Sequence, residues 1–376
     1  MKASVTGADV WYKAPTMNPS DLNTYVPPVA PPSDKTEVEH NDDGSTTTTV
    51  TRPDGSQTIT RETATGTESV VKKDKDGNVT STEVTVSKED AESGGGELPI
   101  EGVEPAADAG RAPEVEVKVP SSVTAGNPVR VTVPVAGGDA FEPDYGIVVF
   151  AVDEDGSEVL IPKCTVDDDG DVVFEVSGDV AIKVVDAARE MVDVTGADWF
   201  AGDVVDFATA RGIVNGVPGA GGPEFRGDAP ASRAMVAAML HNLELAPEAS
   251  SPEGFEDVDA SDWYAAAAAW GASEGIVEGH GDGSRFGGEE PVTREQLAVF
   301  LMRYAAWLGM DTSARAEPAF PDAGSTSGWA REAMEWAVAE GLFSGYGATG
   351  ELRPGAGATR AQVATVLMRF IARMYE

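Results

Sequence analysis

The sequence contains little of what most catalytic and redox sites require. A single cysteine, Cys164, cannot form an internal disulfide, and we expect it to be a small buried residue. The three histidines, His40, His241 and His280, lie in three different segments. No Gly-x-Ser-x-Gly, His-Glu-x-x-His or phosphate-binding loop occurs. We therefore expect no enzyme activity, no bound metal and no cofactor.

Positive charge is scarce as well. Lys and Arg total 27 against 64 Asp and Glu, the formal net charge is −37, and no lysine follows Lys183. This balance excludes nucleic acid as a partner, because phosphates require an excess of Lys and Arg. No stretch approaches the roughly 18 apolar residues of a membrane span, and the first residues lack the apolar core of a signal peptide. We expect neither feature in this chain.

An internal repeat occupies the last 186 residues of the sequence. Independent markers recur there at intervals of 61 to 66 residues, which indicates one supersecondary unit present in three copies. The markers are a tryptophan, a glycine and an arginine: Trp199, Trp263 and Trp329; Gly212, Gly275 and Gly341; Arg233, Arg294 and Arg360.

Each copy predicts two helices joined by a glycine-rich loop. The first helix follows the tryptophan after a polar start residue and ends at the marker glycine, which suits a left-handed C-cap. The loop carries one apolar residue, which we call the plug. The second helix begins after a Ser or Thr cap, and in two copies a Gln completes a capping box. The start residues are Asp198, Asp262 and Ser327, the plugs are Phe225, Phe286 and Leu352, and the caps are Ser232, Thr293 with Gln296, and Thr359 with Gln362.

From about Met191 to Glu376 the chain resembles three tandem S-layer homology domains. The resemblance rests on Phe255-Glu256-Asp257-Val258, Asp262-Trp263-Tyr264, Gly275-Ile276-Val277-Glu278-Gly279, Gly281-Asp282-Gly283 with Phe286, and Thr293-Arg294-Glu295-Gln296. It implies an all-α module with pseudo-threefold symmetry. The implied partner is secondary cell-wall polysaccharide, often pyruvylated, bound in grooves between the repeats. Repeat 1 departs from the pattern at Met235 and at His241-Asn242.

On this basis we predict three kinds of glycan-binding residue, supported by the helix caps. They are the marker arginines Arg233, Arg294 and Arg360, the tryptophans Trp199, Trp263 and Trp329, and the loop glycines Gly216, Gly279 and Gly345, which would let backbone approach the sugar. We expect Arg294 and Arg360 to contribute more than Arg233, because Met235 cannot complete a capping box.

Two interpretations of these residues stay open. A tryptophan at a helix start is more often a core anchor, yet one of its faces can also form the wall of a sugar-binding groove. An arginine at a helix N-terminus gains nothing from the helix dipole and is often solvated. Beside free helix N–H groups, however, a guanidinium makes a carboxylate cradle that suits a pyruvate ketal.

The N-terminal half predicts β-structure. Residues 1–38 are rich in proline and indicate an extended tail. Between 39 and 92, glycine recurs every 11 residues between Thr-rich runs, which predicts a thin β-meander. Residues 93–112 indicate a linker, and the alternating valines of 113–187 predict a small β-sandwich. Residues 188–376 hold the repeats, at about 188–246, 252–311 and 317–376.

We therefore expect a non-enzymatic, extracellular protein anchored to the cell wall, with a β-rich stalk and with self-association left open. One alternative is the C-terminal part of a wall-bound hydrolase whose catalytic domain lies elsewhere. Another is a self-assembling lattice subunit. An extracellular location without a signal peptide fits a piece of a longer protein, a processed form or a misassigned start.

Overall fold

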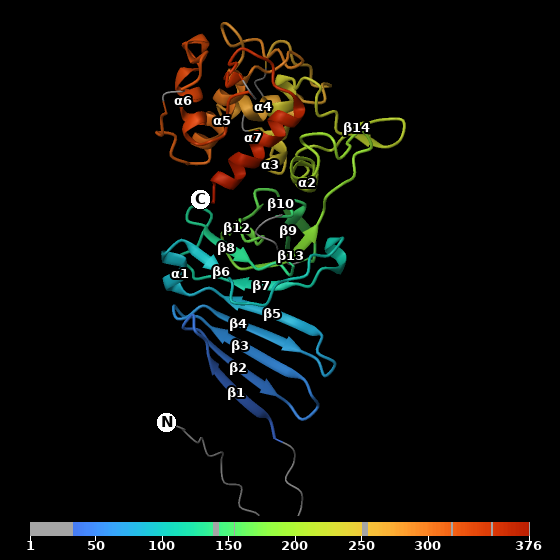
Figure 1. Cartoon of the computed structure of the whole chain (residues 1–376), viewed down its shortest axis with the longest axis vertical. Coiled ribbons are helices and arrows are strands. Elements are labelled where there is room, and N and C mark those ends of the chain that lie inside the picture. Colours follow the sequence, from blue (N-terminus) through green and yellow to red (C-terminus); the bar gives the residue numbers. More distant parts are fainter. Residues whose placement is uncertain are drawn as a thin grey trace, which may run out of the picture.

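The structure is a computed structural model that describes residues 33–137, 143–153, 155–249, 255–316, 319–346 and 349–375. An open sheet leads into two packed sheets and then into a helical module (Figure 1). Most of the predicted tail 1–38 lies outside the described residues. Where residues 35–38 are described the prediction is wrong, because they belong to strand β1 (Lys35–His40), which pairs along its length with β2 (Thr46–Thr51).

Five antiparallel strands follow the 11-residue glycine repeat. After β1 and β2 come β3 (Gln57–Glu62), β4 (Glu68–Lys73) and β5 (Val79–Thr85). Each connecting turn holds its glycine at a φ between 84° and 91°, a region that glycine enters without a Cβ clash. The carboxylates of Asp43 and Asp54 accept the N–H and hydroxyl of the serine that follows. The period is therefore one strand plus one turn.

This sheet continues into the next layer of the fold. β5 pairs in parallel with β7 (Val115–Lys118), and β13 (Val180–Asp186), β9 (Ile147–Val152) and β10 (Glu158–Ile161) complete nine strands. The second sheet has four strands, β11 (Thr165–Val166), β12 (Val172–Val176), β8 (Val129–Val133) and β6 (Gly95–Glu97). The alternating valines of β7 and β8 are buried in the core that these two sheets share.

The predicted linker at residues 93–112 is wrong. A short helix, α1 (Lys88–Glu92), leads into β6, which pairs in parallel with β8, and Leu98 and Ile100 are buried in the sandwich core. A Cβ on Gly95 would lie 1.7 Å from the carbonyl oxygen of Arg130. The glycine run therefore permits close approach of two strands. The composition of this run resembles that of a flexible linker, but its pairing with β8, a strand distant in sequence, fixes its conformation.

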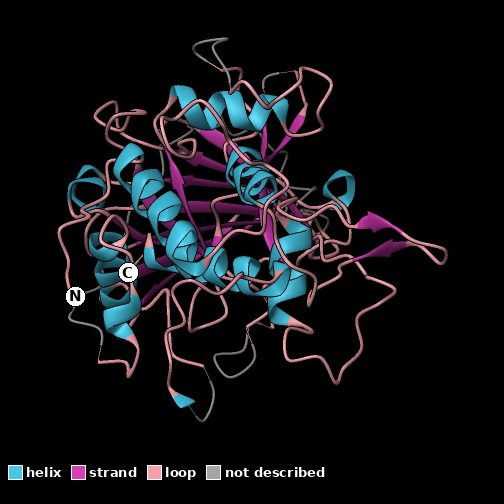
Figure 2. Cartoon of the chain, turned by 90° about the horizontal axis from the view of Figure 1, so that it is seen from above, coloured by secondary structure: helices cyan, strands magenta, loops and turns pink. Residues whose placement is uncertain are grey.

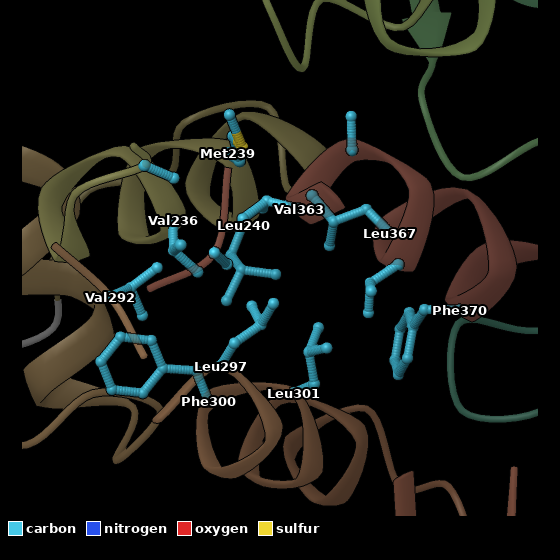
Figure 3. Close-up of a cluster of buried hydrophobic side chains, with 14 of the residues drawn as sticks. Val236, Met239, Leu240, Val292, Leu297, Phe300, Leu301, Val363, Leu367 and Phe370 are labelled. Atoms are coloured by element: carbon cyan, nitrogen blue, oxygen red, sulfur yellow. The ribbon is translucent and has the colours of Figure 1, made fainter. Parts of the chain in front are cut away.

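Six α-helices lie in the described part of the C-terminal half. They are α2 (Asp203–Ala210), α3 (Arg233–Leu243), α4 (Ala265–Ser273), α5 (Arg294–Trp307), α6 (Arg331–Ala339) and α7 (Arg360–Arg373). The second helices of the repeats, α3, α5 and α7, meet through apolar side chains that include Leu240, Leu297, Leu301 and Leu367 (Figure 3). Seen from above, the hairpin of β14 (Val217–Pro218) and β15 (Pro223–Glu224) projects from this module (Figure 2).

The first helices pack across the repeat boundaries. α4 of repeat 2 packs on α3 of repeat 1, α6 of repeat 3 packs on α5 of repeat 2, and α2 of repeat 1 packs on α7 of repeat 3. The last of these contacts joins the two ends of the helical module and closes a ring. No repeat buries its apolar faces alone.

The first helices begin later than predicted. Their N-caps are Gly202, Tyr264 and Ala330, none with a side-chain capping bond. The carboxylates of Asp198 and Asp262 accept a backbone N–H three residues earlier and close a turn there, so each tryptophan stands outside its helix. The predicted C-caps are confirmed, because their glycines have φ of 65° to 72°, and both predicted capping boxes are present.

A buried arginine joins the helical module to the sandwich. Arg211, at the end of α2, is 1% exposed and lies 4.3 Å from the ring centre of Phe207. Its guanidinium donates to the carbonyls of Cys164 at 2.9 Å, Tyr145 at 2.6 Å and Ile147 at 3.2 Å. Cys164 is itself buried, as predicted. The two halves therefore share a fixed interface.

Removing repeat 3, by ending the chain after residue 316, should destabilise repeats 1 and 2. The truncation takes away α7, on which α2 packs, and α6, which covers α5. We expect the helical signal in far-ultraviolet circular dichroism to melt more than about 10 °C below that of the full chain. Unchanged melting of the remaining repeats would show that each repeat is self-sufficient.

Amide hydrogen exchange should become faster from β5 toward β1. Val84 in β5 is fully buried, and Ser69 in β4 donates its hydroxyl to the Pro99 carbonyl, whereas all of β1 is exposed. A single Thr-rich layer buries little apolar area, and each buried Å² stabilises the fold by only about 25 cal/mol. This gain must offset a conformational entropy cost of about 1–2 kcal/mol for each ordered residue. Uniform strong protection from β1 onward would indicate a further partner on this sheet.

Candidate functional site

Three grooves surround the helical module, one beside each second helix. Groove 1 runs along α3 with a volume of about 670 Å³, groove 2 along α5 with about 400 Å³, and groove 3 along α7 with about 560 Å³. Each groove combines the second helix of one repeat, the tryptophan of the next repeat and the arginine of the third.

All nine predicted glycan-binding residues line these grooves. Groove 1 holds Gly216, Trp263 and Arg360, groove 2 holds Gly279, Trp329 and Arg233, and groove 3 holds Gly345, Trp199 and Arg294. The members of each set come from three different repeats. The sequence period identified the residues but not this grouping.

The marker arginines are buried bridges between repeats. Arg233, Arg294 and Arg360 are 3%, 6% and 7% exposed, so the expectation of a solvated helix-start arginine is wrong. Each Nε donates to the carbonyl of a plug in another repeat, namely Phe286 at 2.8 Å, Leu352 at 2.8 Å and Phe225 at 2.9 Å. The Nη2 groups of Arg233 and Arg294 donate to a second carbonyl, at 2.7 and 3.0 Å. These bridges run from repeat 1 to 2, from 2 to 3, and from 3 back to 1.

Aromatic rings and burial set the electrostatics of the bridges. The guanidinium of Arg233 lies over Phe286 and Phe300, and that of Arg294 lies over Phe343 and Tyr346, at 4.8 to 5.2 Å. Desolvation lowers the pKa of Arg233 to about 10 and lowers the pKa of the other two bridges as well. At neutral pH Arg233 therefore remains a cation in a water-poor groove wall.

The expected cradle of free helix N–H groups does not exist. At α3, the N–H groups of Arg233 and Ala234 donate to the carbonyls of Glu290 and Gly288 in repeat 2, and the third N–H is capped by Ser232. The starts of α5 and α7 repeat this arrangement with repeats 3 and 1. A neighbouring loop thus satisfies the groups that would bind an anion at a helix N-terminus. Only the guanidinium remains for that task.

A triangle of backbone hydrogen bonds lies beside these helix starts. The N–H of Ala231 donates to the carbonyl of Ala358, Ala358 donates to Val292, and Val292 donates back to Ala231, each at 2.9 Å. These residues directly precede the three helix caps. Each repeat therefore donates one bond to a second repeat and accepts one from a third.

The burial and capping of α3 do not set Arg233 apart from the other two arginines, and their ranking in binding stays a prediction. Ser232 caps α3 without a glutamine, and Arg233 is as deeply buried as the other two. In addition, the arginine and the glutamine of one helix start face different grooves, since Arg294 lines groove 3 and Gln296 lines groove 2.

The tryptophans are groove walls and not core anchors. Trp199, Trp263 and Trp329 are 59%, 61% and 61% exposed. In repeats 1 and 2 the core position belongs to the next residue, Phe200 or Tyr264, whose ring packs edge-on against the tryptophan. In these two repeats the indole is therefore exposed to solvent and supported by a buried aromatic ring.

The loop glycines serve a different purpose from the one expected. A Cβ at Gly279 would lie 2.3 Å from the carbonyl oxygen of Gly283, and one at Gly345 would lie 2.7 Å from that of Gly350. At Gly216 a Cβ would meet the side chain of Pro223 at 2.8 Å. The missing side chain leaves room for the loop to fold on itself, and the space is already filled by protein.

Sequence reasoning missed an aspartate that holds each groove loop. Asp193, Asp257 and Asp322 each accept the N–H of a plug and of the residue after it, at 2.6 to 2.8 Å. Desolvation alone would raise the pKa of Asp257 and Asp322, but the two backbone N–H groups outweigh it and hold each pKa below its ordinary value. The aspartates recur with the repeat period, and this recurrence is the sequence signal that could have identified them.

Within the residues that the structure describes, no group of three or more His, Cys, Asp or Glu side chains is arranged to hold a metal ion. The described helices likewise include none with the length and apolar character needed to cross a membrane.

The model of the S-layer homology domain family matches residues 191–235, 254–298 and 319–364. The chain carries three tandem S-layer homology domains. Each match contains one groove tryptophan, one plug and the start of one second helix. The domains therefore coincide with the repeats, while the grooves lie between them.

Two relatives are cell-surface proteins by name. Over 194 residues, 51% of this chain, the sequence is 32% identical to the surface-layer 125 kDa protein of Lysinibacillus sphaericus. Over 106 residues, 28% of this chain, it is 37% identical to cell surface glycoprotein 1 of Acetivibrio thermocellus. The matches span 16% and 4% of the lengths of those proteins.

Replacing Arg233 by Lys should lower the free energy of unfolding of the helical module by about 1–3 kcal/mol. Lysine keeps the charge but not the fork that reaches two carbonyls of repeat 2, so one buried carbonyl loses its partner. Urea unfolding of the full chain measures the loss. Arg303→Lys is the control, because the ion pair of Arg303 among the described residues is with the exposed carboxylate of Glu278. Equal stability of the two variants would contradict a bridging role.

Proposed function

We propose that this chain anchors a surface protein non-covalently to the cell wall, by binding secondary cell-wall polysaccharide in its three grooves. The observation that carries the proposal is the threefold recurrence of one arrangement: an exposed indole and a buried guanidinium that line the same groove of 400 to 670 Å³. Both relatives are named as surface proteins, which supports an extracellular, wall-associated location.

The groove chemistry suits a polysaccharide that carries acidic groups. An indole face packs on the C–H face of a sugar ring. A guanidinium binds a carboxylate strongly when water is excluded, and the three arginines are only 3% to 7% exposed to solvent. A pyruvate ketal has a carboxylate beside a methyl group, so it matches a guanidinium within an apolar wall. We therefore extend the proposal to a pyruvylated polymer.

The net charge of −37 limits how such binding works. The long-range field of the protein repels an anionic polymer, so attraction must arise within the grooves. Three grooves on one rigid module can engage one polymer chain together. Weak binding at each of the three grooves then gives a high overall affinity, because the second and third contacts are intramolecular.

Replacing any groove tryptophan by Ala should weaken binding to purified wall polysaccharide by about tenfold, which is about 1.4 kcal/mol. Trp199, Trp263 and Trp329 are the sites, and isothermal titration calorimetry is the measurement. Trp307→Ala is the matched control, since Trp307 is 39% exposed on α5 but lines none of the three grooves. Thermal melts verify that each variant is folded.

Two outcomes of this comparison count against the proposal. If the wild-type chain does not bind the polysaccharide, the anchoring function is wrong. If the control loses as much affinity as the three groove variants, the binding surface lies outside the grooves.

A further inference from the structure

The three grooves share their architecture but differ in charge. On the groove side of the second helix, one position is occupied by Asn242 in groove 1, Arg303 in groove 2 and Arg369 in groove 3. These residues are related by the repeat period, with spacings of 61 and 66. Each points into a groove that already holds one bridging arginine.

Carboxylates offset the cation of groove 1 and one of the two cations of groove 2. Groove 1 holds Arg360 as its cation and Glu289 as its anion, and Glu289 accepts a hydrogen bond from the indole of Trp263 at 3.3 Å. Groove 2 holds Arg233 and Arg303, but Glu278 lies 2.7 Å from Arg303. With histidine counted as neutral, the formal charges of the groove linings are 0 and +1.

Groove 3 has the opposite character. Arg294 and Arg369 both line it, and no carboxylate does among the residues described there. Arg369 has one described contact, a 3.3 Å bond from Nη1 to the carbonyl of Leu342. Desolvation has the largest effect on the pKa of Arg294 and lowers it, whereas Tyr346 and Asp322 raise it. The charge of Arg369 repels that of Arg294 and also lowers this pKa. Two cations in a groove whose described lining holds no carboxylate need a reason in a chain with net charge −37.

We propose that groove 3 is a site for a doubly charged oxyanion, such as a phosphate group or paired carboxylates, held between Arg294 and Arg369. This inference rests on the proposed function and assigns the three grooves different parts of one polymer. Groove 3 binds its most acidic substituent, groove 2 a singly charged group, and groove 1 a neutral sugar.

The energetics favour this division of roles. The repulsion between Arg294 and Arg369 is released when a dianion binds between them, and neither arginine has to leave a carboxylate first. In groove 2, an incoming anion must compete with Glu278 for Arg303. In groove 1, Glu289 repels any anion that approaches Trp263. The hydroxyl of Tyr346 and the side chain of Gln362, 3.2 Å apart, add polar groups at groove 3.

Each groove contains its own reporter, which makes a direct test available. The indole N–H signals of Trp199, Trp263 and Trp329 report grooves 3, 1 and 2 in nuclear magnetic resonance spectra of the full chain. The probes are inorganic phosphate, malonate as a dicarboxylate, acetate as a monoanion, and methyl glucoside as a neutral sugar. We expect phosphate or malonate to shift Trp199 at a concentration at least about tenfold below that needed for Trp329, and acetate to show a weaker preference.

Two substitutions move this preference in opposite directions. Arg369→Asn copies the residue of groove 1 and should weaken the response of Trp199 to the dianions about tenfold, with Trp329 unchanged. Glu278→Gln removes the competing carboxylate of groove 2 and should strengthen the response of Trp329, with Trp199 unchanged. Both side chains are partly or largely exposed, and the Glu278 carbonyl that Arg233 uses is retained.

The outcomes separate this inference from the anchoring proposal. If phosphate and malonate shift the three indoles equally, or if Arg369→Asn leaves the Trp199 response intact, the groove 3 site is wrong whether or not the chain binds polysaccharide. A larger response to phosphate than to malonate identifies a phosphate substituent on the polymer, and the reverse identifies carboxylates. If the wild-type chain shows the Trp199 response but binds no wall polysaccharide, the site stands and the anchoring function fails.

Discussion

The helical module depends on hydrogen bonds that each repeat makes with its two neighbours. Every second helix has its first two N–H groups satisfied by carbonyls of another repeat, and its first side chain is an arginine that enters that same repeat. Unsatisfied N–H groups and a buried guanidinium without partners would each cost several kcal/mol. A single repeat therefore cannot fold with its polar groups satisfied, whereas three repeats can when the last one returns to the first.

The grooves follow from the same constraint. Because each bridging arginine crosses a repeat boundary, its side chain lies in a groove whose helix belongs to a different repeat. Because each first helix packs on the preceding second helix, its tryptophan lies over that helix as well. The residues that hold the ring closed and those that line the grooves are partly the same, so the fold and the groove surface cannot vary independently.

The β-rich half shows how a repeat with little apolar content is held in place. Its outer strands form a single layer, but β5 pairs with β7, so the meander extends a sheet whose far end is packed in a sandwich core. The sandwich in turn is joined to the helices by the buried guanidinium of Arg211. The helical module and the outer sheet are therefore linked through the nine-stranded sheet and through side-chain contacts that include Arg211 and the Lys163–Glu244 ion pair.

Local chemistry is what the sequence determined by itself. The hydrogen bonds of a capping box and the positive φ of a C-cap glycine involve residues within one turn, so the pattern around Thr293 and Gly275 specified both. The repeat period likewise identified nine of the residues that line the grooves, and the 11-residue glycine spacing specified strands and turns. These features need no knowledge of what lies across the molecule.

Only the tertiary structure decided which residues meet. Arg360 and Trp263 are almost a hundred residues apart, and no local pattern indicates that they share a groove. The burial of the arginines, the occupied helix N-termini and the use of Gly95 as a strand contact all arise from pairings distant in sequence. Those pairings depend on how the ring closes, because an interaction between distant segments is set by the packing of the whole chain and not by the residues beside it.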